Sequence, residues 1–575
     1  MTGRPPDAPR PRHLHDVTAT YRIVESRSSP RHAAPAGSPP DIEPSLLHSS
    51  RIVAIGSAAS RITGFIRTIA ITAAIGLGGI GDAYATANTL PNIVYELLLG
   101  ALLTSIIVPL LVHAQHNDSD GGEAYAQRLM SVSTLLLLVV TAAAVLLAPA
   151  LTSLYGVLHD PNQIRVANIL ARLLLIEIVF YGIGAMLGAI LNTRGVYGAP
   201  AWAPVLNNGV VVATAVVFFV MPGPHTLNVA TITTAQMLVL GIGTTLGIVV
   251  QAAVLIPAAR RVGFRWKWRL DVRGTGMGEI GTLGLWVLGY VLTSAIGYLV
   301  ITRLSLAAGH HSGIGYAVYT NQSLLFQVPY GIAGVALLTT LLPRMSRAAA
   351  AGNTRAVVAD LSLGARLTAV ALVPVTAAYI ALGPALTTVI FAHGRAAPEA
   401  AYGTGIALAW AAFGLLPYAI TLLQLRAFYA IKDARTPTVI NAVMVVVRIA
   451  LCLAVPHVVA PDHVVAGLAF VNSLSFVPGV LLGEVLLRGR FGALQSGRVL
   501  RTTIRLVLAS AAGGGVAYGI RAVVERAFGA QFEGAAIALV LGSVLGGAVM
   551  LFVALRLRVA ELRDVVGSLR RRPAG

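Results

Sequence analysis

The stretch SRITGFIRTIAITAAIGLGGIGDAYATANTLPN, residues 60–92, combines two features that rarely occur together. Its first half is apolar enough to cross a lipid bilayer, yet it carries Arg61 and Arg67. A lipid-facing arginine near mid-membrane costs about 2.5–3.5 kcal/mol even on the lenient insertion scale. The stretch therefore predicts a membrane helix whose charged side chains face the interior of a helix bundle.

The rest of the chain extends this interpretation. Of its 575 residues, 56% are hydrophobic and only 11% are charged, and the mean hydropathy is +0.77. Long apolar runs between short polar segments are typical of a polytopic membrane protein, so we expect an all-α fold. At roughly 20 residues per crossing, hydropathy predicts about fourteen spans. They lie near 51–77, 83–114, 126–155, 164–192, 201–222, 231–258, 277–308, 314–343, 356–392, 401–428, 436–458, 463–487, 502–526 and 534–556.

The formal net charge of +19 is distributed unevenly. Arginine and lysine gather in the N-terminal tail and in alternate loops, whereas the opposite loops, such as "GLGGIG" and "MPGPHTLN", carry almost none. The positive-inside rule then places both termini in the cytoplasm. We interpret the basic charge as a determinant of orientation that attracts anionic lipid headgroups, and we expect no nucleic-acid partner.

Enzyme chemistry is not expected. The sequence has no P-loop, nucleophile elbow or HExxH motif, and its single cysteine, Cys452, excludes a disulfide framework and a cysteine metal cluster. His310 and His311 are adjacent, a spacing that disfavours a metal site. We predict no catalytic residue, no metal site and no cofactor.

The chain also repeats itself. "GALLTSIIVP" returns as "GVALLTTLLP", "PALTSLYG" as "PALTTVIFAHG" and "APVLN" as "TPTVIN", always in the same order. An offset of six spans gives both halves the same orientation, so we predict two six-helix lobes related by a pseudo-two-fold axis along the membrane normal, with a substrate site between them. The paired prolines are Pro109 and Pro343, Pro149 and Pro384, and Pro204 and Pro437.

The repeat predicts the domain organisation. The chain divides into a disordered basic cytoplasmic tail (1–50), a first lobe with spans one to six (51–258), a basic cytoplasmic loop (259–276), a second lobe with spans seven to twelve (277–490), two extra spans (500–558) and a basic cytoplasmic tail (559–575).

The candidate binding residues are the polar groups inside the predicted spans. Arg61 and Arg67 lie about 9 Å apart along one helix, so both can face one aqueous cavity. Arg303 follows Arg67 at nearly the repeat offset. A guanidinium binds two phosphate oxygens at once, which indicates a site for an anionic group such as a pyrophosphate. The predicted substrate-binding set is Arg61, Arg67, Asp82, Asn92, Glu96 and Arg303.

Structural roles remain open for the same residues. Arg61 and Arg67 can snorkel to the cytoplasmic interface, and Arg303 can cap the external end of its helix. Glu96 is equally well explained by a structural ion pair. We interpret Arg172 and Glu177 as structural or rim charges.

At these residues the chain resembles the MurJ/MviN family, the lipid II flippases of the MOP transporter superfamily, as a divergent, actinobacterial-type member. The resemblance implies a two-lobed transporter that carries lipid II, the lipid-linked peptidoglycan precursor, across the inner membrane of a bacterium by alternating access. A cationic central cavity would take the headgroup, and a lateral groove would take the polyprenyl tail. The matching segments are "SRITGFIRTIAITAAIGLG", "DAYATANTLPN", "AILNTRGVYGAPAWAPVLNN", "GVALLTTLLPRMSR" and "LQLRAFYAIKDARTPTVI".

The chain departs from the family pattern at two places. Tyr95 and Glu96 stand where typical members have an arginine pair, and Leu324, near Gln327, stands where they have another arginine. The span at 436–458 contains no acid, so sodium coupling is not supported. Coupling is then expected from the membrane potential or from an unidentified ion.

Three other functions remain open at this stage. One is a flippase for another polyprenyl-linked glycan, and a second is a cation-coupled drug exporter, against which the arginines argue. The third is a non-transporting scaffold that assembles cell-wall synthesis proteins. Complementation and arginine substitution would distinguish them.

Overall fold

The computed structural model describes residues 44–100, 108–158, 160–224, 226–271, 282–431, 433–559 and 561. The chain separates into two units, and the second, which begins at Ser49, contains the helical body. All regular structure in the described ranges is helical. Residues 1–43 of the predicted disordered tail and most of the predicted C-terminal tail lie outside the described residues. The last part of the predicted disordered tail, residues 44–50, is instead the first part of a helix that begins at Pro44.

The first half of the body runs from α1 to α10. Its third element, η1, is a π-helix that continues α2 directly. The helices are α1 (Pro44–Ile75), α2 (Gly79–Tyr95), η1 (Glu96–Gly100), α3 (Val108–Asn117), α4 (Glu123–Leu146), α5 (Ala148–Leu154), α6 (Pro161–Leu174), α7 (Glu177–Thr193), α8 (Gly198–Val220), α9 (Thr234–Ala253) and α10 (Leu255–Arg261).

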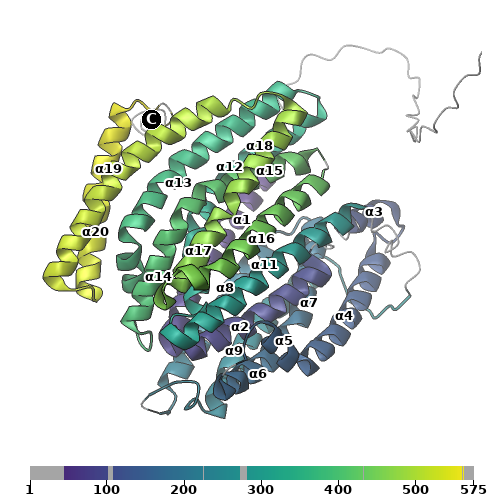
Figure 1. Cartoon of the computed structure of the whole chain (residues 1–575). Helices are drawn as coiled ribbons and strands as arrows, with labels where there is room; N and C mark the ends of the chain where they lie inside the picture. Colours follow the sequence, from purple (N-terminus) through teal and green to yellow (C-terminus); the bar gives the residue numbers. More distant parts are fainter. Residues whose placement is uncertain are drawn as a thin grey trace, which may run out of the picture. The chain divides into compact units, whose positions relative to one another are not determined.

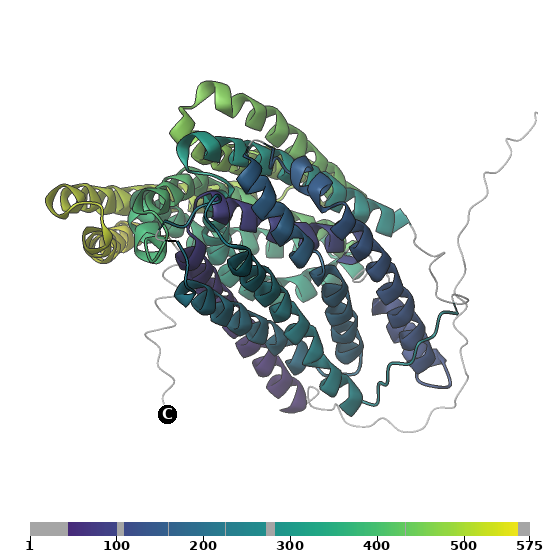
Figure 2. The ribbon, with the colours of Figure 1, turned by 90° about the horizontal axis from the view of Figure 1, so that it is seen from below.

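The second half runs from α11 to α18, and two further helices follow it. Figures 1 and 2 show α19 and α20 side by side at one edge of the body, where both pack against α13. The helices are α11 (Thr282–Ser312), α12 (Tyr316–Ala350), α13 (Thr354–Phe391), α14 (Pro398–Ala411), η4 (Ala412–Gly414), α15 (Leu415–Ala430), α16 (Arg435–Val458), η5 (Pro461–His463), α17 (Val464–Leu474), α18 (Phe476–Phe491), α19 (Ser496–Phe528) and α20 (Phe532–Arg556).

The predicted all-α polytopic fold is confirmed. Within the described residues, twelve helical segments are long and apolar enough to cross a membrane. The two other predicted spans correspond to α2–α3, which is interrupted by residues outside the description, and to α12. The number of about fourteen spans therefore stays a prediction, as do the domain bounds.

Several spans are broken in the middle. The breaks separate α6 from α7, α9 from α10, α14 from α15 and α17 from α18, so they fall in the fourth and sixth spans of each half. A break leaves main-chain groups without intrahelical partners and aims the next residues away from the helix axis. In transporters such interrupted helices often border the binding site.

The repeat is visible in the packing of the two halves. Asn208 in α8 and Asn441 in α16 each follow the repeat proline by four residues. Each amide nitrogen donates to one main-chain carbonyl and one hydroxyl of the first helix of its own half. The acceptors are Ser60 O and Thr63 Oγ1 for Asn208, at 3.1 and 2.9 Å, and Tyr290 O and Ser294 Oγ for Asn441, at 3.2 and 2.9 Å.

Other helix pairs repeat in the same way. The contact between α2 and α6 recurs between α12 and α14, and the contact between α6 and α9 recurs between α14 and α17. The two halves are thus built alike, as the sequence repeat predicts.

The first helix of each half is the least enclosed. Only 6% of the apolar window of α1 and 17% of that of α11 is buried, against 39–61% for the candidate spans that follow each of them within its half. An apolar helix that its own bundle covers so little lies at the boundary of that bundle. This arrangement places Arg61, Arg67 and Arg303 on boundary helices.

Candidate functional site

Arg61 reaches from α1 toward the other half. Its side chain is exposed, and its guanidinium rests against Gly331 of α12, where an added Cβ would overlap with Nη1. A larger side chain at this position would displace the guanidinium of Arg61. Arg61 therefore lies where the two halves meet, as a residue of a shared cavity should.

Arg67 lies two turns further along α1 and is half-buried. It interacts electrostatically with Glu177, the first residue of α7, and with the hydroxyls of Tyr84 and Tyr181. The Glu177 side chain is fully buried. Arg67 is therefore the positive member of a polar group inside the first half.

The carboxylate of Glu177 is incompletely hydrogen-bonded. Its Oε1 lies 3.5 Å from Thr245 Oγ1, and Oε2 has no hydrogen-bond partner among the described residues. A buried carboxylate without full hydrogen bonding is costly unless a positive charge compensates it. Glu177 and Arg67 form no ion pair among the described residues, but the two side chains interact electrostatically. The break between α6 and α7 aims Glu177 toward Arg67, which the interpretation as a structural or rim charge did not anticipate.

Asn92 joins this group indirectly. It forms a side-chain hydrogen bond with Tyr181, whose ring packs against that of Tyr95 at a centroid distance of 5.8 Å. Asn92 and Glu96 are both exposed, and Glu96 opens the π-helix η1. The aromatic side chain of Tyr95 thus supports the tyrosine beside Arg67 and Glu177.

Asp82 contacts the opposite half at the N-terminal end of α12. It is only 3% exposed, and Oδ1 accepts a hydrogen bond of 2.7 Å from the main-chain nitrogen of Ala317. Gly315 is needed beside it because an added Cβ would collide with the carboxylate. A carboxylate at a helix N-terminus pairs with the unsatisfied N–H groups and the positive end of the dipole.

Arg303 and Arg395 make the converse contact. Arg303 Nη1 donates to the carbonyl of Leu154, the last residue of α5, at 3.1 Å. Arg395, in the turn between α13 and α14, donates through Nη1 to the carbonyl of Ala74 at 3.0 Å, near the end of α1. Both arginines belong to the second half, and both bind the negative end of a helix of the first half.

These three residues, Asp82, Arg303 and Arg395, are called the latch below. Each is a charged side chain of one half bound to a helix end of opposite partial charge in the other half. They join the two halves near the end of α1 and the beginning of α12, a face called the latch face. The structure thus places Asp82 and Arg303 in the latch, while Arg61 and Arg67 lie on α1, and the predicted substrate-binding role of all six residues stays a prediction.

The ion pairs are distributed differently. Five ion pairs in the described part of the chain join residues of the second half or of the helices that follow it. The pairs are Arg344–Asp360, Arg366–Glu561, Arg488–Glu484, Arg490–Asp433 and Arg521–Glu525. Charged contacts between the halves are therefore concentrated at the latch.

The latch contains one residue that the sequence did not indicate. Arg395 lies in a short turn with no periodic pattern, and its main-chain nitrogen also donates to Ala73 O at 2.9 Å. Its guanidinium packs over the rings of Phe218 and Phe219, at 5.6 and 5.3 Å from their centroids. A basic residue in an otherwise uncharged loop was the available signal.

Two similar helical halves, arginines on the least enclosed helix of the first half, and contacts that close one face define a membrane transporter of the alternating-access class. The family model described as "Lipid II flippase MurJ" matches residues 71–556. The chain belongs to this family.

Curated relatives agree with the family assignment. A probable lipid II flippase MurJ of Rhizobium meliloti is 26% identical over 462 residues, which cover 79% of this chain and 82% of the relative. The lipid II flippase MurJ of Burkholderia cenocepacia is 28% identical over 442 residues, which cover 74% and 80%.

Solved structures show the same fold. An inward closed conformation of lipid II flippase MurJ matches with a TM-score of 0.70 at 17% identity, over 90% of this chain and all of the other. An inward-facing multidrug resistance MATE family transporter of the MOP superfamily matches with a TM-score of 0.59 at 17% identity, over 78% and 99%. The predicted fold is therefore shared with both solved structures.

Proposed function

We propose that this chain is a lipid II flippase that moves its substrate from the inner to the outer leaflet of the bacterial cytoplasmic membrane by alternating access. Arg61 and Arg67 bind the pyrophosphate. The observation that carries the proposal is the position of Arg61, which extends from the least enclosed helix of one half onto Gly331 of the other. A phosphate held there contacts both halves, so its binding free energy depends on their relative position.

The physical problem is the headgroup, not the tail. A charged glycan cannot cross about 30 Å of hydrocarbon unaided, whereas the polyprenyl tail never has to leave the lipid. A cavity of about 240 Å³ lies between α13, α19 and α20, lined mainly by small residues such as Gly513, Gly514, Gly546 and Gly547. Small residues let an extended chain approach the helix backbone closely, so this cavity fits part of the tail.

Substrate binding and Glu177 compete for the same arginine. In the structure the buried Glu177 interacts electrostatically with Arg67. A pyrophosphate that binds Arg61 and Arg67 brings additional negative charge beside this buried acid. The two anions repel each other, so the bound state favours a rearrangement of α1 against α7.

The latch face is the outer face in this proposal. The positive-inside rule places the basic loops, among them residues 262–271, in the cytoplasm, and the latch lies at the opposite ends of the helices. The structure then corresponds to a state closed to the outside. Release of Asp82, Arg303 and Arg395 would open the route through which the headgroup leaves.

The membrane potential is the proposed driving force, and no cofactor takes part. An inside-negative potential favours outward movement of negative charge by about 2.3 kcal/mol per charge per 100 mV. Anionic lipids would bind the basic loops, and cell-wall synthesis proteins are the proposed protein partners. Full flipping in vesicles after the potential is collapsed would contradict this part of the proposal.

Complementation of a lipid II flippase-depleted strain tests the proposal directly. We expect the parent chain to restore growth and lipid II exposure at the cell surface, and the R61A/R67A double variant to fail while reaching the membrane at normal levels. A scaffold would tolerate the double substitution. If the chain instead flips another polyprenyl-linked glycan, even the parent chain without substitutions would not restore growth.

A further inference from the structure

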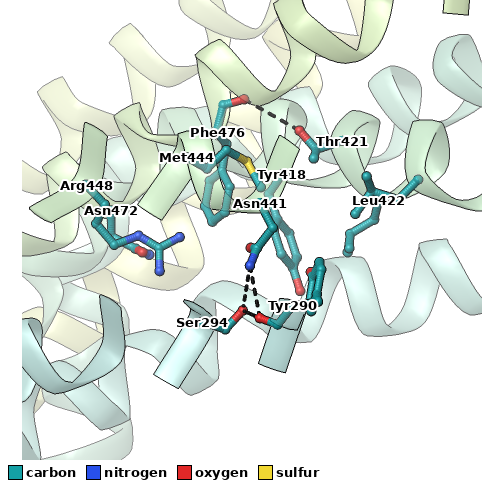
Figure 3. Close-up of a pocket in the computed structure, with 11 residues that line it drawn as sticks. Tyr290, Ser294, Tyr418, Thr421, Leu422, Asn441, Met444, Arg448, Asn472 and Phe476 are labelled. Carbon is teal, nitrogen blue, oxygen red and sulfur yellow. Dashed lines mark hydrogen bonds between the residues drawn. The ribbon is translucent and has the colours of Figure 1, made fainter. Parts of the chain in front are cut away.

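A second polar cavity lies entirely within the second half of the body. It has a volume of about 200 Å³ and is enclosed by α11, α15, α16, α17 and α18 (Figure 3). None of its lining residues is acidic. The polar lining residues are Tyr290, Ser294, Tyr418, Thr421, Asn441, Arg448 and Asn472.

Arg448 is the only charged side chain of this lining. Its Nε donates to Ser475 Oγ at 3.3 Å, at the break between α17 and α18, and its guanidinium lies 5.8 Å from the ring centroid of Phe476. None of the ion pairs of the described residues includes Arg448. A positive charge inside an apolar bundle without a negative partner is costly, so an occupant that supplies the negative charge is favoured.

The donors around the cavity outnumber the acceptors that satisfy them. Asn472 lines the cavity, and its side chain makes no hydrogen bond within the described part of the chain. The amide nitrogen of Asn441, in contrast, is already bound to Tyr290 O and Ser294 Oγ. The guanidinium nitrogens of Arg448 and the amide of Asn472 are thus the donors that an occupant would meet first.

The first half shows that the architecture does not require this arginine. The residue of α8 that corresponds to Arg448 at the Asn208–Asn441 offset is Ala215, which is 2% exposed and belongs to the hydrophobic core. The same helix pair therefore closes with a methyl group in one half and carries a guanidinium in the other. On the α11 side, Nη1 of Arg448 lies beside Gly297, at an ordinary contact distance of 3.5 Å from the position of an added Cβ.

We propose that this cavity binds a small monovalent anion, of halide or short-chain carboxylate size, between Arg448 and Asn472. The anion neutralises the guanidinium and links α16 to α17, so it stabilises the second half. The site lies apart from Arg61 and Arg67. It therefore stands independently of the proposed flippase function.

The test uses the full-length protein purified in detergent with gluconate, a bulky and strongly hydrated anion, as the only anion before chloride or acetate is added. We expect chloride or acetate to raise the melting temperature by at least about 2 °C with saturation. The R448Q variant should show no saturable rise. The matched control is R355Q, which removes the same charge from an exposed position at the start of α13, away from the cavity lining, and should respond as the parent does. The chloride and acetate arms distinguish a halide site from a carboxylate site.

A second variant keeps the test decisive if R448Q does not fold. N472D places a tethered carboxylate beside the guanidinium and should both raise the melting temperature in gluconate and abolish the response to added anions. Equal anion responses in the parent, R448Q and N472D would overturn the proposal, as would a parent that does not respond. Weak, non-saturating responses in all variants would mean general salt effects only and would overturn it as well.

Discussion

The latch makes a quantitative prediction for Asp82→Ala. The side chain accepts a charge-assisted hydrogen bond of 2.7 Å from Ala317 N across the two halves. Hydrogen bonds to charged groups contribute about 1.5–3 kcal/mol net. Because the contact exists only while the latch face is closed, its loss destabilises that state alone. At 1.4 kcal/mol per factor of ten, the ratio of closed to open molecules should fall by about ten- to 150-fold.

Distances between spin labels across the latch face measure this ratio. Leu158 in the first half and His311 in the second are both exposed, and Cys452, the only native cysteine, is buried and can be replaced by alanine. Cysteines at these two positions should give one short distance in the parent background. Asp82→Ala should add a longer distance with a substantial population.

Asp120 provides the matched control. It accepts hydrogen bonds from the main-chain nitrogens of Gly122 and Ala124, at 3.0 and 2.7 Å, but it caps a helix of its own half. Asp120→Ala should therefore leave the distance distribution unchanged. The latch argument is refuted if Asp82→Ala behaves like Asp120→Ala, because Asp82 would then be a static cap without influence on opening.

Three further predictions concern the arginines and the opposite face. Gly331→Leu should displace the Arg61 guanidinium and lower lipid II flipping in vesicles at least about tenfold, because a misplaced charge no longer binds phosphate oxygens in pairs. The control in the same vesicle assay is Gly489→Leu, since an added Cβ at Gly489 has nothing within 4 Å. Glu177→Gln should tighten binding of farnesyl pyrophosphate, measured by calorimetry, by about fivefold or more, because Arg67 no longer shares its charge with a carboxylate; unchanged affinity would contradict the competition. Although partial burial opposes ionisation of Asp433, hydrogen bonds from Thr436 and the nearby Arg490 outweigh it and hold the pKa of Asp433 below its usual range. The resulting stabilisation is present above the unfolded-state pKa of about 3.9 and is lost as the pH falls through the folded-state value, so the melting temperature should fall less on acidification in Asp433→Asn than in the parent.

The sequence predicted the architecture because its signals are local or periodic. Apolar runs of sufficient length mark membrane helices, and the proline–asparagine pairs at 204–208 and 437–441 recur at a constant offset that the structure shows as equivalent hydrogen bonds. The charge of Arg61 in an apolar run likewise indicated a polar interface. Each of these inferences needs only residues that are neighbours on one helix.

The latch and the interaction of Glu177 with Arg67 could not be predicted from signals within one helix. Whether Arg303 meets a phosphate or a helix end depends on the vertical position of α11 relative to α5, which no spacing within one helix specifies. Glu177 points toward α1 because the chain breaks two residues before it, and an apolar sequence such as that around residue 175 carries no clear break signal. Contacts between distant elements decided both roles.

The chemistry of the latch explains how one substrate could open it. Three salt bridges buried between the halves would each leave two unpaired charges when broken, at a cost of several kcal/mol. The latch instead pairs a single charge with a helix end, through charged hydrogen bonds that contribute about 1.5–3 kcal/mol each. The released side chain returns to water, and the helix end loses only partial charges. The summed free energy of the three latch contacts is then comparable with the free energy that two arginines gain from binding one pyrophosphate. A two-state transporter needs this balance, because a ligand can shift an equilibrium only by its difference in affinity for the two states.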